Sequence, residues 1–243
     1  MKQAMIFAAG LGTRLKPITD TMPKALVPVA GKPLLCHVLR KMQDAGMERV
    51  VVNVHHFANQ IVDFLRDNPP QGLDIRISDE SQQLLETGGG IKKARPLFDN
   101  ASPVLIHNVD ILSNARLESL YLTEGDAALL VSDRPSSRRL LFDDDMRLVG
   151  WRNMNTGEIR SPHSWVKEAD QTGRLTLLAF SGIHLFSHSL FPLMDEWPER
   201  FPIIDFYLQA CATKLIRGVP QPDLRLIDVG KLDSLDQAAA FIT

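Results

Sequence analysis

Short apolar runs alternate with helical segments along the first half of the chain, and this alternation constrains the fold more than any other feature. Residues 4–9 and 103–106 are apolar runs, and residues 49–54 are rich in valine, as expected for strands buried on both faces of a sheet. Residues 33–45 and 58–66 carry apolar side chains at helical spacing. Strands joined through helices need crossover connections. The sequence therefore predicts an α/β fold with a Rossmann-like, mixed, mostly parallel sheet flanked by helices.

The second half of the chain is less regular and predicts a small lobe rich in strands. Strands are expected at residues 126–132, 140–143, 148–151, 174–186, 214–219 and 224–227, and helices at 188–197, 203–213 and 234–242. Residues 153–172 are polar and irregular, so we expect a mobile flap there. No linker divides the 243 residues, and the sequence predicts a single domain with two halves, about 1–130 and about 131–243.

Composition and charge exclude several classes of protein. The formal net charge of −2 argues against a general nucleic-acid surface, which needs a basic excess. No apolar run approaches the roughly 18 residues of a membrane helix, so no membrane partner is expected. The first ten residues lead directly into a strand and a glycine loop, without room for a signal peptide, and Cys36 and Cys211 are expected to be buried thiols. We therefore expect a cytoplasmic protein.

A glycine loop follows the first predicted strand, in the run Ala8-Ala9-Gly10-Leu11-Gly12-Thr13-Arg14. Glycine lets backbone N–H groups approach phosphate oxygens closely. The dinucleotide fingerprint is excluded because Leu15 stands where its third glycine belongs, and no Gly-Lys-Ser/Thr closes a P-loop. The loop continues past two prolines, which predicts an extended arm that brings Arg14 and Lys24 to one anionic ligand. A simple glycine turn with two solvated cations is the alternative.

Two aspartates follow predicted strands and are candidate metal ligands. Asp110 comes after the apolar run at 103–107, and Asp228 comes after the strand expected at 224–227. Open α/β sheets bind their ligands at the carboxyl ends of strands, and Mg²⁺ is held by few carboxylates together with substrate phosphates. The alternative for each aspartate is a helix N-cap or a turn residue.

The string GLGTRLKPITDTMPKALVPVAGKPLL resembles the signature of the sugar-1-phosphate nucleotidyltransferase family over about 26 residues. The resemblance implies that Ala8 to Arg14 wrap a nucleoside triphosphate. It implies that Arg14 holds the β- and γ-phosphates, and that Lys24 bridges phosphate oxygens of both reactants. Asn108-Val109-Asp110 and Asp228-Val229-Gly230-Lys231 resemble the family's two magnesium-binding segments. Val109 and Lys231 replace the family's glycine and threonine, which leaves the neighbouring backbone contacts open.

Two further segments resemble the family's substrate pockets. In Leu85-Glu86-Thr87-Gly88-Gly89-Gly90, three glycines allow a flat base to lie against the backbone, and the resemblance implies that Glu86, Gly88 and Gly89 border the nucleobase. A flexible loop before a helix is the alternative. Phe180-Ser181-Gly182-Ile183 resembles the segment that lines the sugar site, so Ser181 and Gly182 are sugar-binding candidates together with Asn108. A bulge in a strand is the alternative there.

The central Glu-Lys-Pro of many relatives, whose lysine grips the sugar phosphate, is absent. Arg152 could replace that lysine, or Lys24 could act alone. Trp151 could stack on a substrate ring, although a core position is the alternative.

The form Glu-Thr-Gly-Gly-Gly-Ile is similar to the N-acetylmuramate-1-phosphate uridylyltransferases of peptidoglycan recycling. The resemblance implies UTP and N-acetylmuramic acid 1-phosphate as substrates, Mg²⁺ as cofactor, and a monomer or small homo-oligomer. The first half would then bind the nucleotide and the second half the sugar. Guanylyl transfer to mannose or heptose 1-phosphate is one alternative. A catalytically inactive nucleotide-sugar sensor is another.

Overall fold

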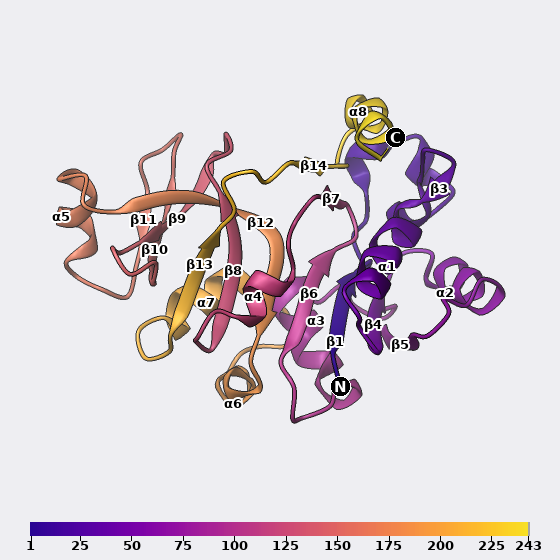
Figure 1. Ribbon diagram of the computed structural model, residues 1–243, viewed down its shortest axis with the longest axis horizontal. Helices are drawn as coiled ribbons and strands as arrows, with labels where there is room; N and C mark the ends of the chain where they lie inside the picture. The colour runs from indigo at the N-terminus through magenta and orange to yellow at the C-terminus, as the bar shows by residue number, and fades with distance from the viewer. Residues whose placement is uncertain (243) are drawn as a thin grey trace.

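The computed structural model describes residues 1–242 and is built around a mixed sheet of ten strands (Figure 1). The strand order is β11-β10-β9-β12-β6-β1-β4-β5, with β8 paired to β12 and β13 paired to β8. Both the α/β class and the mixed sheet predicted from the sequence are confirmed.

The strands of the first half are parallel. They are β1 (Gln3–Phe7), β4 (Arg49–Val54), β5 (Asp74–Asp79) and β6 (Val104–Asn108). Met5 of β1 lies opposite Val51 of β4 and Ile106 of β6. Four parallel strands therefore end at the same edge of the sheet, which is where the candidate site is found.

Helices cover both faces of this parallel sheet, as the apolar runs predicted. The helices are α1 (Leu34–Asp44), α2 (Ala58–Asp67), α3 (Glu86–Ala94), α4 (Glu118–Tyr121), α6 (Phe191–Met194), α7 (Ile203–Ala210) and α8 (Asp233–Ile242). Alternate residues of β1 face opposite sides. Ala4 and Ile6 pack in a core with α1 and α2, whereas Met5 packs in a second core with α3, α6 and α7.

The second half forms the predicted lobe. Its elements are β8 (Ala127–Ser132), β9 (Arg138–Phe142), β10 (Leu148–Asn153), β11 (Ile159–Arg160), α5 (Val166–Gln171), β12 (Thr176–Phe186) and β13 (Ile216–Pro220). β12 joins the two halves, because its end pairs with β6 and its start with β9. A small separate core lies between β9, β10 and α5. The polar residues 153–172, expected to be irregular, include β11 and α5.

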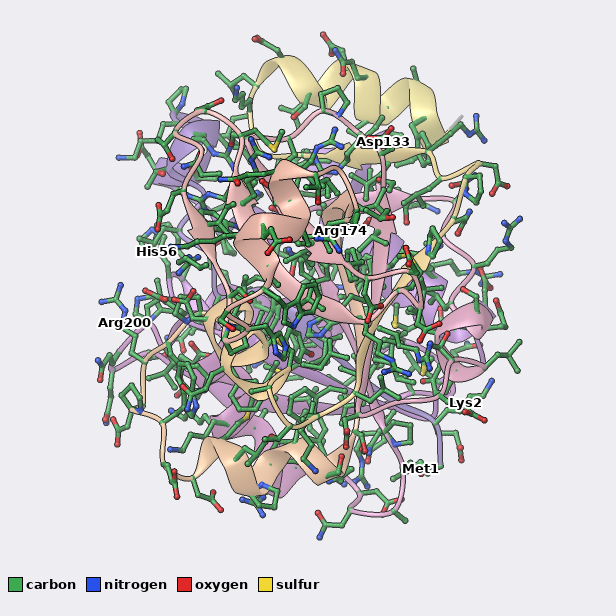
Figure 2. The ribbon with its side chains drawn as sticks, turned by 90° about the vertical axis from the view of Figure 1, so that its left-hand side faces the viewer. Met1, Lys2, His56, Asp133, Arg174 and Arg200 are labelled. Carbon is green, nitrogen blue, oxygen red and sulfur yellow. The ribbon has the colours of Figure 1, made fainter. Side chains whose placement is uncertain are left out.

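Short elements complete the fold near the ends of the parallel strands. They are β2 (Pro28–Val29), β3 (Lys32–Pro33), β7 (Ile111–Ser113), β14 (Leu226–Asp228) and the 3₁₀ turns η1 (Thr13–Leu15), η2 (Ile18–Asp20), η3 (Lys24–Leu26), η4 (Arg95–Leu97) and η5 (His188–Leu190). Met1 and Lys2 lie at the end of the molecule opposite α8 (Figure 2). Within residues 1–242, no helix has the length and apolar character needed to cross a bilayer.

Candidate active site

A cavity of about 540 Å³ opens at the carboxyl ends of β1, β4 and β6. Its wall includes the glycine loop from Ala9 to Arg14, and also Lys24, Asn108 and Asp110. The structure thus brings together segments that the sequence singled out separately. Ala8 lies just behind the loop and is buried. The arrangement places the glycine loop, the cationic side chains of Arg14 and Lys24 and the carboxylate of Asp110 around a single cavity.

Gly12 holds the loop and the following arm together. Its φ of +65° is a left-handed conformation that favours glycine. The Gly12 carbonyl accepts hydrogen bonds from the Leu15 amide and the Thr19 hydroxyl, both at 2.8 Å. A Cβ at Gly12 would lie 2.9 Å from Thr19 Cγ2 and 3.0 Å from Lys24 Cβ. The arm therefore folds back onto the loop, and this close approach brings Lys24 to the cavity wall.

A buried polar network fixes the start of the loop. Asn53 Oδ1 accepts a hydrogen bond from the Ala8 amide at 2.7 Å, and Asn53 Nδ2 donates to Glu80 Oε1 at 2.7 Å. Glu80 Oε2 accepts from the Leu85 amide at 3.1 Å, just before α3. Burial raises the pKa of the Glu80 carboxyl, while the hydrogen bonds from Asn53 and Leu85 act in the opposite direction.

Sequence reasoning missed both Asn53 and Glu80, which line the first cavity. The available signal was a single amide side chain inside the valine-rich strand at 49–54. A buried amide in such a run needs hydrogen-bond partners, so it marks a polar network.

The two candidate metal ligands lie on adjacent backbone segments. β14 pairs with β7 in antiparallel fashion, which puts Asp228 opposite Ile111, and the Val229 amide donates a 2.8 Å hydrogen bond to the Asp110 carbonyl. Asp110 also forms a salt bridge with Lys24. Within residues 1–242, no cluster of three or more histidine, cysteine or acidic side chains could hold a metal. Asp110 and Asp228 are carboxylates on neighbouring segments, a donor type that Mg²⁺ accepts together with phosphate oxygens.

Arg14 lies beside the second aspartate. A Cβ added at Gly230 would lie 2.7 Å from both Arg14 Nη2 and Asp228 Oδ1. In the described part of the chain, the Arg14 guanidinium has no hydrogen bond or ion pair, so its donors are available to an anionic ligand. Glycine at position 230 leaves the space into which both side chains extend.

Two residues expected to border the base pack against a neighbouring segment. Gly88 and Gly89 lie in the first turns of α3, and their amides donate to the Phe201 carbonyl at 2.8 and 3.2 Å. A Cβ at Gly88 would lie 2.3 Å from the Phe201 ring, and one at Gly89 would lie 2.0 Å from the Glu199 carbonyl oxygen. Neither glycine lines the cavity. These two glycines therefore pack closely against residues 199–201, and their contact with a base stays a prediction.

Of the same segment, Glu86 and Thr87 do line the cavity. Glu86 has a φ of +61° at the start of α3 and forms a 3.0 Å salt bridge with Arg200. Thr87 accepts a 2.9 Å hydrogen bond from the Ile203 amide through its hydroxyl oxygen. The loop expected before a helix is thus the beginning of the helix itself.

A second cavity of about 860 Å³ adjoins the first and shares Arg14 and Pro202 with it. Its wall comes mainly from the lobe and contains Arg134, Arg138, Trp151, Arg160 and Phe180. Asp228, at the end of β14, also lines it. Sequence reasoning missed the three arginines, because no local pattern marks their shared orientation. The two cavities are thus adjacent, with Arg14 between them.

Ser181 and Gly182 lie behind these cavities rather than in their walls. The pairing of β12 with β8 shifts between Phe180 and His184, and Gly182 has a φ of +75°, so the bulge alternative is the observed one. A Cβ at Gly182 would lie 2.7 Å from Asn108 Nδ2. Gly182 therefore leaves room for Asn108, whereas the buried Ser181 hydroxyl has no hydrogen-bond partner in the described residues.

Arg152 does not take the place of the missing lysine. Its guanidinium forms a 2.7 Å salt bridge with Asp170, whose side chain is only 5% exposed, and it lines neither cavity. Lys24 thus remains as the lysine at the site. Trp151 is largely buried but contributes to the second cavity, where the Arg160 guanidinium lies 4.2 Å from its ring centre.

Two buried histidines are neutral neighbours of the site. Burial lowers the pKa of His107 to about 4 and that of His184 to about 3. The His107 ring pairs with the Asn108 carbonyl at 2.7 Å through Nδ1. Cys36 and Cys211 are free thiols, as expected, and both are partly buried.

Comparisons with known proteins agree with this geometry. A family model described as nucleotidyl transferase matches residues 3–126. The chain is 51% identical over 191 residues to the N-acetylmuramate alpha-1-phosphate uridylyltransferase of Caulobacter vibrioides, an alignment that covers 76% of this chain and 74% of that protein. It is 41% identical over 121 residues to the protein of the same name from Neisseria meningitidis, covering 50% of this chain and 52% of the relative.

Among solved structures, HddC from Yersinia pseudotuberculosis in complex with GMP-PN superposes with a TM-score of 0.77 at 22% identity, covering 100% of both chains. The UDP-glucose pyrophosphorylase of Acinetobacter baumanii also gives 0.77, at 16% identity, covering 99% of this chain and 93% of that one. At these identities the likeness is one of fold.

Proposed function

This chain belongs to the nucleotidyl transferase family and is a sugar-1-phosphate nucleotidyltransferase, and we propose that it joins UTP to N-acetylmuramic acid 1-phosphate with release of pyrophosphate. The observation that carries the proposal is the convergence of Arg14, Lys24, Asp110 and Asp228 where the two cavities meet. The choice of substrates is supported by the two uridylyltransferase relatives. We further propose that the reaction belongs to cytoplasmic peptidoglycan recycling.

The reaction needs positioning and charge stabilisation rather than a protein nucleophile. A phosphate oxygen of the sugar 1-phosphate attacks the α-phosphorus of the triphosphate in line, and the bond from that phosphorus to the bridging oxygen of pyrophosphate breaks. The loop from Gly10 to Thr13 lines the first cavity, where its backbone N–H groups would bind the triphosphate. Lys24 and Arg14 place positive charge on the phosphates, as preorganised groups that cost little reorganisation.

We propose that Asp110 and Asp228 hold Mg²⁺. The donor set fits, because two carboxylates on adjacent backbone segments leave the remaining positions to phosphate oxygens and water. The metal would neutralise charge on the triphosphate. Lys24 forms a salt bridge with Asp110, so its positive charge lies beside the carboxylate that would bind the metal and the triphosphate.

Guanylyl transfer is a second candidate, supported by relatives of that activity. The chain is 30% identical to a probable mannose-1-phosphate guanylyltransferase of Oryza sativa, over 59% of this chain and 42% of the relative. The choice between uracil and guanine would rest on hydrogen bonds from polar groups of the cavity wall, among which are Glu86 and Thr87.

A substrate matrix tests the proposal. The four nucleoside triphosphates are combined with N-acetylmuramic acid, N-acetylglucosamine and mannose 1-phosphates, and pyrophosphate release is measured with Mg²⁺. We expect UTP and N-acetylmuramic acid 1-phosphate to give the highest kcat/KM. A tenfold preference for GTP would support the guanylyl alternative. Binding of a nucleotide sugar by folded protein without turnover of any pair would indicate a sensor.

A further inference from the structure

The second cavity contains positive charge that the protein itself does not neutralise. Of the three lobe arginines in its wall, Arg160 forms a 2.8 Å salt bridge with Asp205. Arg134 and Arg138 form no ion pair with any acidic residue within residues 1–242. Their neighbour Arg139, by contrast, is paired with Asp133 at 2.7 Å and does not line the cavity.

Arg134 is anchored with most of its donors unused. Its Nη2 donates a 3.0 Å hydrogen bond to the Phe180 carbonyl, while its Nε is buried and has no partner in the described residues. A guanidinium has five N–H donors, and a partly buried cation without a counter-charge is unfavourable. An anion placed in this cavity would therefore be stabilised by Arg134. Arg138, at the start of β9, is exposed and lines the same cavity.

The acidic residues of this wall offset that charge only in part, because four arginines and three acidic residues line it. Asp205 is used by Arg160, and Asp228 lies beside Arg14. Glu158 is exposed and forms no ion pair in the described part of the chain. The rest of the wall is mixed: Trp151, Leu140, Phe180 and Ile204 are apolar or aromatic, whereas Ser136, Ser137 and Asn153 are polar. Aromatic and hydroxyl side chains beside two guanidinium groups without an ion pair suit a sugar ring that carries a carboxylate.

We propose that Arg134 and Arg138 bind the carboxylate of an acidic sugar 1-phosphate and select it over neutral sugars. This assignment rests on the proposed function. The sugar phosphate is a less suitable ligand for the two arginines, because the reacting groups Lys24 and Asp110 line only the first cavity. Arg134 and Arg138 line only the second cavity, and Arg14 is the arginine common to both. The carboxylate would thus point away from the reacting phosphate.

Two substrates that differ in one group test this assignment. N-acetylmuramic acid 1-phosphate carries a lactyl carboxylate that N-acetylglucosamine 1-phosphate lacks. We expect the double variant Arg134→Gln/Arg138→Gln to lower kcat/KM for the acidic substrate roughly 10- to 100-fold, mainly through KM, because it removes charge-assisted hydrogen bonds. The neutral substrate should change less than about threefold. Arg174→Gln is the control, since Arg174 is a lobe arginine on the surface, paired with Glu168, that lines neither cavity.

An equal loss of kcat/KM with both substrates would overturn the assignment. It would show that the arginines bind the phosphate, which both substrates share, or that they stabilise the lobe. If Arg134→Gln lowers the folded fraction measured by circular dichroism, the exposed Arg138→Gln is used alone, and an unchanged preference for the acidic sugar then contradicts the proposal. Absence of turnover by the unmodified protein with every sugar 1-phosphate contradicts the proposed function. Turnover with a preference that the double variant keeps contradicts only the role of the arginines.

Discussion

The ammonium group of Lys24 forms a salt bridge with the carboxylate of Asp110, which follows it by 86 positions in the chain. The two side chains are only 9% and 21% exposed. This pair ties the arm after the glycine loop to the end of β6. It therefore couples the position of a phosphate-binding lysine to the position of a metal-binding candidate.

Loss of the lysine charge should affect both stability and activity. In Lys24→Met the Asp110 carboxylate loses its partner, and we expect the free energy of unfolding to fall by roughly 1–3 kcal/mol. Turnover should fall roughly 10²- to 10³-fold, as for other main electrostatic groups. Denaturant unfolding and pyrophosphate release measure the two effects. Lys16→Met on the same arm, whose lysine is 60% exposed and paired with Asp20, should change stability by less than about 0.5 kcal/mol.

The aspartate pair can be separated into metal and structural contributions. Asp110→Asn and Asp228→Asn should each lower kcat by about 10² or more, because each removes a charge from the proposed magnesium site. Only Asp110→Asn should also lower the melting temperature, since Asp228 is exposed and has no ion pair within residues 1–242. Pyrophosphate release is followed across a Mg²⁺ titration. Near-normal kcat at saturating Mg²⁺ in either variant would remove that residue from the metal site.

Alanine at Gly88 or Gly89 distinguishes helix packing from base binding. The added Cβ would meet the Phe201 ring or the Glu199 carbonyl, so we expect each variant to lose roughly 1–3 kcal/mol of stability. A helical glycine with free space would instead gain about 0.4–1 kcal/mol on replacement by alanine. Thermal unfolding provides the measurement, with the exposed Lys93→Ala on α3 as control. Increased stability together with a raised KM for the triphosphate would support the base-binding interpretation.

Acid should destabilise the fold partly through its buried histidines. The pKa of His107 is lowered from 6.5 to about 4 by burial, so its contribution to stability is complete above pH 6.5 and is lost as the pH falls toward 4. Replacement by glutamine removes this titration. The difference between His107→Gln and the unmodified protein should therefore shrink between pH 7 and pH 5, by up to roughly 1.4 kcal/mol per pH unit.

Urea unfolding at several pH values checks this expectation. His56 is exposed and lies at the surface (Figure 2), so His56→Gln serves as the matched control substitution. A stability difference that is the same at pH 5 and pH 7 would show that His107 does not titrate in this way.

Much of the fold was predictable because its signals are local. The valine-rich run at 49–54 is β4, and the strand expected at 103–106 differs from β6 by one or two residues at each end. Apolar spacing on one side of a segment fixes a helix or a strand before any tertiary contact forms. The glycine loop, the arm and the aspartates after strands are likewise defined by neighbouring residues.

By itself, therefore, the sequence determined most of the helices and strands, and the segments that contain candidate binding and catalytic side chains. Only the tertiary structure decided which of them meet. The pairing of β7 with β14 brings Asp228 beside Asp110, and the folded arm brings Lys24 to Asp110. Gly88 packs against Phe201, where a larger side chain would not fit. Arg152 forms a salt bridge with Asp170 and lines neither cavity. These contacts join residues far apart in the chain, and their existence depends on strand register and side-chain packing, which no local pattern records.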